Sequence, residues 1–170
     1  MSAKPSVEDT QPMKATPDPL PIIESLWSEK HPGQSEINLR GLLPAAKARG
    51  DQTYLAELLT VISRSLTMQG KTKIARKSLS TVERLLTTDM PRVRVMYLIE
   101  RGRVFANSNE PSKASILWRS AWKVARDLGE QELANQAAQL HATLKKERPD
   151  IRDTHNPRDT GGLKSSAVAG

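Results

Sequence analysis

The sequence repeats itself at a fixed interval, and this feature constrains the fold more than any other. Ala56, Val95 and Ala134 follow one another at steps of 39 residues. The other positions matched at this offset are all apolar or small: Leu59 with Leu98, Leu66 with Phe105, Ala75 with Ala114, and Leu79 with Trp118. Such a period is typical of arrays in which each unit is one pair of helices and neighbouring units stack to bury their apolar faces.

Five helical segments are expected between Asp51 and Glu147, because apolar residues recur there at steps of three and four. We expect Thr72 to cap the second of them. Turn and capping residues separate the segments: Gly50 and Asp51, Gly70, Asp89 and Pro91, Glu110 and Pro111, and Gly129. The connections are short, so consecutive helices should be antiparallel neighbours.

The second unit alternates large, small and aromatic residues on its first helix, then small, aromatic and small residues on its second. These residues are Leu98, Gly102, Phe105, Ala114, Trp118 and Ala121, and the first unit matches them with Leu59, Ser63, Leu66, Ala75, Leu79 and Val82. The pattern resembles the tetratricopeptide repeat family, in which small residues allow a close helix crossing. The resemblance implies an all-α solenoid of antiparallel helix pairs, with about two to three repeats and a C-terminal capping helix.

The repeat domain is expected to span residues 19–148. Its N-terminal unit is degenerate, because Glu24, Glu36 and Arg40 stand where small or apolar residues belong. Pro44 should kink that unit's second helix or mark a new start. Residues 1–18 and 149–170 are polar and rich in turn-forming residues, and we expect both to be disordered tails.

Nothing in the sequence indicates a catalytic site, a metal or a cofactor. There is no cysteine, the three histidines are far apart, and no nucleophile elbow or glycine-rich phosphate loop occurs. Trp118 and Trp122 are expected to pack in the core rather than stack on nucleic-acid bases. No segment has the apolar character of an export signal or a membrane span, so we expect a cytoplasmic protein without a membrane partner.

The chain is basic, and its excess charge is concentrated in one segment. The net charge is +7, and residues 91–128 hold eight Lys and Arg against three Asp and Glu, a net +5. A basic face attracts nucleic acid and acidic peptides alike. Nucleic-acid binding through phosphate contacts is therefore one alternative function, and self-association through an exposed end helix is another.

The tetratricopeptide resemblance also implies a binding surface, since the first helix of each pair lines the concave side in that family. Here this surface would comprise Glu57, Thr60, Arg64 and Thr67 from the first unit and Met96, Ile99, Arg103 and Asn107 from the second. Arg64 and Arg103 are one repeat apart and should receive an acidic partner, unless Glu100 neutralises Arg103 within its own helix. The predicted function is a non-catalytic scaffold or adaptor that binds a peptide or protein surface.

Overall fold

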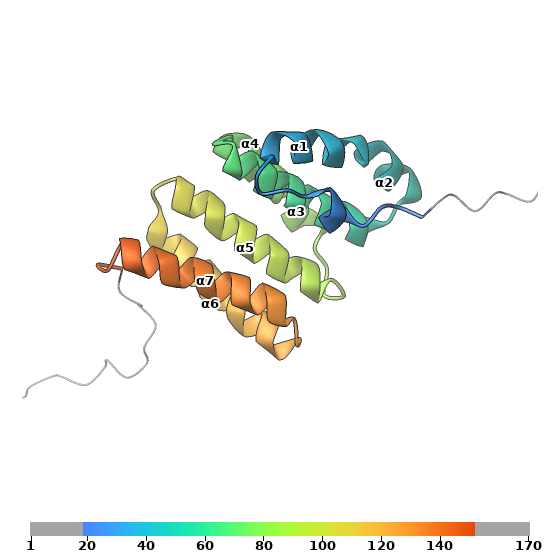
Figure 1. Ribbon diagram of the computed structural model, residues 1–170. Helices are drawn as coiled ribbons and strands as arrows, with labels where there is room; N and C mark the ends of the chain where they lie inside the picture. The colour runs from blue at the N-terminus through green and yellow to red at the C-terminus, as the bar shows by residue number, and fades with distance from the viewer. Residues whose placement is uncertain (1–18, 152–170) are drawn as a thin grey trace, which may run out of the picture.

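The computed structural model describes residues 19–151, and every regular element in that range is helical (Figure 1). The N-terminal part holds a short 3-10 helix and two short α-helices: η1 (Ile23–Leu26), α1 (Pro32–Gly41) and α2 (Leu43–Arg49). The longer helices are α3 (Gln52–Met68), α4 (Thr72–Leu85), α5 (Pro91–Asn107), α6 (Pro111–Asp127) and α7 (Gln131–Glu147). The predicted all-α fold of repeated helix pairs is confirmed, and each helix expected after Asp51 is present.

The 39-residue period is visible in the backbone itself. Helices α3 and α5 both have 17 residues, and their first residues are 39 positions apart. The turns that follow them use a left-handed residue at the same place in the repeat, Gly70 (φ 73°) and Asn109 (φ 58°). In both turns the next backbone N–H donates to a carbonyl oxygen five residues back, at 2.9 Å. This geometry satisfies the last carbonyl groups of each first helix and turns the chain into the second.

The starts of α3, α5 and α6 follow from the residues found there. The Asp51 side chain accepts a hydrogen bond from the backbone N–H of Tyr54 at 2.9 Å, as an N-cap should. Helices α5 and α6 both begin with proline, whose missing N–H is not needed there. Thr72 is the first residue of α4 rather than its cap; the cap position is Lys71, whose side chain makes no capping bond.

The longer helices form two antiparallel pairs, α3 with α4 and α5 with α6 (Figure 1). Helix α3 lies beside α5, and α7 packs mainly on α6. A close crossing occurs where Gly102 of α5 meets the indole of Trp118 of α6, which is 3% exposed. The Trp118 Nε1–H donates to the backbone carbonyl of Ile99 at 2.9 Å. The predicted role of Gly102 as a small residue at a helix crossing is confirmed.

The N-terminal part packs against α3 but does not repeat the geometry of the later pairs. Pro44 lies in the first turn of α2, so it marks a new helix start, one of the two outcomes predicted for it. The charges that made this unit look degenerate have partners in the fold. Glu36 pairs with Arg40 at 2.8 Å and with Lys71 at 3.0 Å.

The folded region extends beyond the predicted limit at residue 148. Ile151 is only 8% exposed and belongs to a small cluster with Ala114, Trp118 and Leu144. Its apolar side chain covers the end of this cluster, so the last described residues are part of the packed domain. The predicted disorder of residues 1–18 and of residues 152–170 concerns segments outside the described range.

Candidate functional site

The structure places most of the predicted concave-face residues in the interior. Five of them have exposed fractions of at most 7%: Thr60, Met96 and Ile99 (0%), Thr67 (3%) and Arg64 (7%). The remaining three are half-buried or exposed: Glu57, Arg103 and Asn107. The prediction that all eight form an open surface is therefore corrected, because neighbouring parts of the chain cover this side of α3 and α5.

Arg64 and Arg103 do come together, but on a carboxylate of the chain itself. The fully buried Glu100 lies between them, with its Oε1 2.8 Å from Arg64 Nε and its Oε2 3.3 Å from Arg103 Nε. Burial lowers the pKa of Arg64, but the charge and hydrogen bond of Glu100 outweigh it and raise that pKa above its ordinary value. The expected alternative, in which Glu100 pairs with Arg103, is confirmed, and α5 supplies the acid that was expected from a partner.

The segment before α1 lies against α3 (Figure 1) and covers Arg64 further. The Arg64 guanidinium carbon lies 5.3 Å from the ring centre of Trp27, and Arg64 Nη1 lies 3.8 Å from a carboxylate oxygen of Glu24. Ile23 of the same segment is 3% exposed, and the Tyr54 hydroxyl donates to the carbonyl oxygen of Pro21 at 2.8 Å. Sequence reasoning missed this packing because the segment has no helical period.

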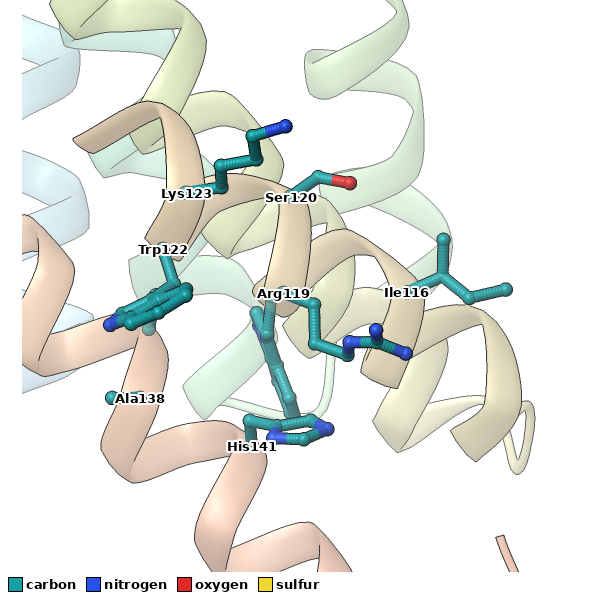
Figure 2. A pocket seen from close by; sticks show the side chains of 9 residues that line it. Ile116, Arg119, Ser120, Trp122, Lys123, Ala138 and His141 are labelled. Atoms are coloured by element: carbon teal, nitrogen blue, oxygen red, sulfur yellow. The ribbon is translucent and has the colours of Figure 1, made fainter. Parts of the chain in front are cut away.

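A groove of about 640 Å³ lies between α6 and α7. Figure 2 shows Trp122 of α6 beside Ala138 of α7 and Arg119 of α6 beside His141 of α7, with Ile116 further along α6. The full lining is Ile116, Trp118, Arg119, Ser120, Trp122, Lys123, Ala137, Ala138 and His141. The groove is thus mainly apolar and open along one side of α6.

Two large apolar side chains of this groove reach solvent. Ile116 is 55% exposed, and Trp122 is 39% exposed although it was predicted to pack in the core. Trp118, four residues before Trp122, is buried as predicted. The core prediction for Trp122 is therefore wrong, because α7 covers the Trp118 face of α6 and leaves the adjoining face open.

Cations surround these exposed apolar groups. Arg119 and Lys123 line the groove, and the Arg126 guanidinium stacks on the Trp122 ring at 4.8 Å from its centre. None of the lining residues is acidic. The arrangement can bind an apolar surface that carries negative charge at its edge.

The first repeat provides an internal comparison for this surface. The positions 39 residues before Ile116 and Trp122 are Lys77 and Glu83, and both are exposed. The same place in the repeat therefore tolerates charged residues, so packing of the helix pair does not require Ile116 or Trp122. This offset comparison was the signal in the sequence that distinguishes these two side chains from core residues.

Residues 19–151 were found to hold neither a metal-binding cluster nor a membrane-spanning helix. No group of three or more His, Cys, Asp or Glu residues there could hold a metal ion, and none of its helices has the length and apolar character needed to cross a membrane. No family model, curated protein or solved structure matches the chain.

Proposed function

We propose that this chain is a non-catalytic, tetratricopeptide-type adaptor that binds another protein in the groove between α6 and α7. The observation that carries the proposal is the pair Ile116 and Trp122, which reach solvent beside a groove of about 640 Å³. Exposed apolar side chains that the fold does not require are typical of interaction surfaces. Tryptophan in particular is enriched among residues that dominate binding free energies.

The position of the groove supports the same proposal. Helix α7 is the last helix of the described range, and it packs mainly on α6. In an array of stacked helix pairs, the face at the end of the array is the one that a further helix would cover. A partner that contributes such a helix would extend the packing of the array without rearranging it.

The concave face supports docking less well. Its most central residues, Thr60 and Ile99, are fully buried, and Asn107 donates a hydrogen bond to the Thr67 carbonyl oxygen at 3.3 Å. A partner would first have to separate these internal contacts. The groove needs no such rearrangement, so the proposal assigns the docking surface to α6 and α7.

A cross-linking experiment tests this assignment. A photoreactive phenylalanine replaces Ile116 in one full-length variant and Ile74 in a control, because Ile74 is 50% exposed on α4, away from the groove. We expect a discrete cross-linked protein from position 116 and none from position 74. The purified cross-linked protein should also bind the unmodified chain, and Trp122→Gln should abolish that binding. Equal cross-linking from both positions, or none from position 116, would refute the groove as the docking surface.

Nucleic-acid binding remains the second candidate, and the exposed cations of the two second helices favour it. They include Lys73, Lys77 and Arg84 on α4 and Lys123 and Arg126 on α6. Phosphate contacts made by these cations predict an affinity for nucleic acid that falls steeply as the salt concentration rises. They also predict that removal of each cation lowers this affinity by a similar factor. Trp122→Gln would leave such binding nearly unchanged, which separates it from docking in the groove.

A further inference from the structure

We infer that the occupant of the α6–α7 groove is an amphipathic α-helix of a partner protein with acidic residues along the edges of its apolar face. The inference rests on the proposed function and adds the chemistry of the partner to it. Three features of the groove support it: the spacing of its side chains, the sign of its charge, and the contrast with the first repeat.

The spacing fits a helix laid along the groove. Ile116, Arg119 and Lys123 of α6 line the groove, and Arg126 stacks on Trp122 at its edge. These four positions follow one another at three or four residues, so they form a stripe along one helix face. From the first to the last this stripe is about 15 Å long, at roughly 1.5 Å per residue. An amphipathic partner helix of about three turns would match it, with apolar anchors at the same three- and four-residue spacing.

The chemistry of the lining favours such a helix over a polyanion. Ile116 and Ala138 are exposed apolar groups, and they gain nothing from a phosphate backbone. The Trp122 ring lines the groove, and the Arg126 guanidinium stacks on it. An apolar side chain of the partner can therefore pack beside the ring while a carboxylate of the partner pairs with the guanidinium. Tryptophan and arginine are both enriched among the residues that dominate binding free energies.

The charge of the groove sets the partner's sign. Lys123 and Arg126 are exposed at its edge, and no acidic residue lines it. A second copy of the chain is a poor electrostatic match, because the net charge is +7. The segment 152–170 is also a poor match, since it holds three Lys and Arg against two Asp. An acidic helix of another protein is the occupant with complementary charge.

The contrast with the first repeat indicates that Ile116 and Trp122 serve binding. At the equivalent positions α4 carries the charged residues Lys77 and Glu83, so it offers no apolar anchor there. The first repeat is folded in the same way without Ile116 or Trp122. A helix that docks on α6 should therefore ignore α4, and this gives the experiment its matched control.

The test uses a displayed library of 18-residue helices, selected on the full-length chain. The library varies the apolar stripe among Leu, Ile, Phe and Ala and the flanking positions among Glu, Gln and Lys. We expect the selected helices to be enriched in Glu at the flanks. The best synthetic peptide should bind about tenfold more tightly than its copy with every flanking Glu replaced by Lys.

Variants of the chain then locate the binding. Trp122→Gln should weaken the selected peptide about tenfold, a loss typical of an aromatic anchor, whereas Ile74→Gln on α4 should leave its affinity unchanged. The double variant Lys123→Glu with Arg126→Glu should reverse the preference between the Glu and Lys peptides. Melting curves of the three variants check that each remains folded.

Several results would overturn the inference. Equal affinity for the Glu and Lys peptides would show that charge does not select the partner, while a cross-link from position 116 would still support the groove itself. Selection of no helix at all, or selected helices insensitive to Trp122→Gln, would show that helices do not dock there. A chain ending at Ile151 that binds the selected peptide tenfold more tightly than the full chain would identify residues 152–170 as the occupant.

Discussion

Replacing Gly102 by alanine should destabilise the domain, although alanine is the better helix former. An ideal Cβ at position 102 would lie 2.7 and 2.8 Å from the Cδ1 and Cε2 atoms of Trp118, and closer still to its Nε1. Two carbon atoms that are not bonded to each other cannot approach so closely, so the indole must move. It is 3% exposed and held by the hydrogen bond to the Ile99 carbonyl, so it has little room to do so.

The expected magnitude follows from three opposing terms. Alanine gains about 1 kcal/mol of helix propensity over glycine in a helix interior. Overpacking a well-packed interior costs about 1–3 kcal/mol. Because the indole must move, its buried Nε1–H loses the Ile99 carbonyl, which costs about 1–3 kcal/mol more. The net destabilisation of Gly102→Ala should therefore lie between about 1 and 5 kcal/mol, with cost outweighing propensity.

Urea denaturation measures this change as a shift of the midpoint at constant slope. Gly41→Ala is the matched control, because a Cβ there would meet nothing within 4 Å, and it should be neutral or stabilising. The first repeat also supplies a rescue: it places Ser63 and Leu79 where the second has Gly102 and Trp118. Gly102→Ser alone should be destabilising, and adding Trp118→Leu should recover part of the loss. A Gly102→Ala variant as stable as the parent would refute the steric argument.

Three further predictions concern the charges and the C-terminal end. Glu100→Ala should cost about 3–5 kcal/mol in urea denaturation, because it leaves the buried Arg64 with only the more distant carboxylate of Glu24. Arg64→Met together with Glu100→Met should cost less than the sum of these two changes made singly, and additive losses would contradict a direct pair. Burial raises the pKa of Glu36, but hydrogen bonds from Arg40, Lys71 and Gln69 lower it from 4.5 to about 2 overall, so its ionised form stabilises the fold above pH 4.5. That contribution, roughly 2–3 kcal/mol, should disappear as the pH falls from 4.5 towards 2 and be missing in Glu36→Gln, whose stability should approach the parent's at low pH; a parent-minus-variant difference that is constant with pH would oppose the assignment. Ile151→Ala should lower stability by about 1–3 kcal/mol because it opens the cluster around Trp118, whereas an unchanged denaturation midpoint would show that Ile151 adds nothing to the packing.

The repeated helix pairs could be predicted because local sequence carries them. Apolar residues at helical spacing, a capping Asp51, and the turn residues Gly70 and Gly129 each act within a few positions of the chain. The 39-residue offset then relates one pair to the next, and Gly102 against Trp118 follows from the small and aromatic positions of the motif. These features require no knowledge of distant contacts.

The candidate site could not be predicted in the same way, because it depends on which face of a helix a distant segment covers. Periodicity places Trp122 on the apolar side of α6 but does not show that α7 stops short of it. Likewise Arg64 is polar in sequence, yet Trp27 and Glu24 of the N-terminal segment enclose it. The fully buried Glu100 also contacts Arg64 of α3, and helical periodicity does not show such a contact between two helices.

The carboxylate of Glu100 has a consequence for how the domain opens. It joins Arg64 of α3 to Arg103 of α5, and Arg64 in turn contacts the N-terminal segment. In helical arrays each unit can in principle unfold by itself, because it contacts only its neighbours. Here, separating the two units would strand a buried charge, so amides of α3 and α5 should exchange with solvent through one shared opening event. A variant with Met at positions 64 and 100 should retain the helices but let the two units exchange at different rates.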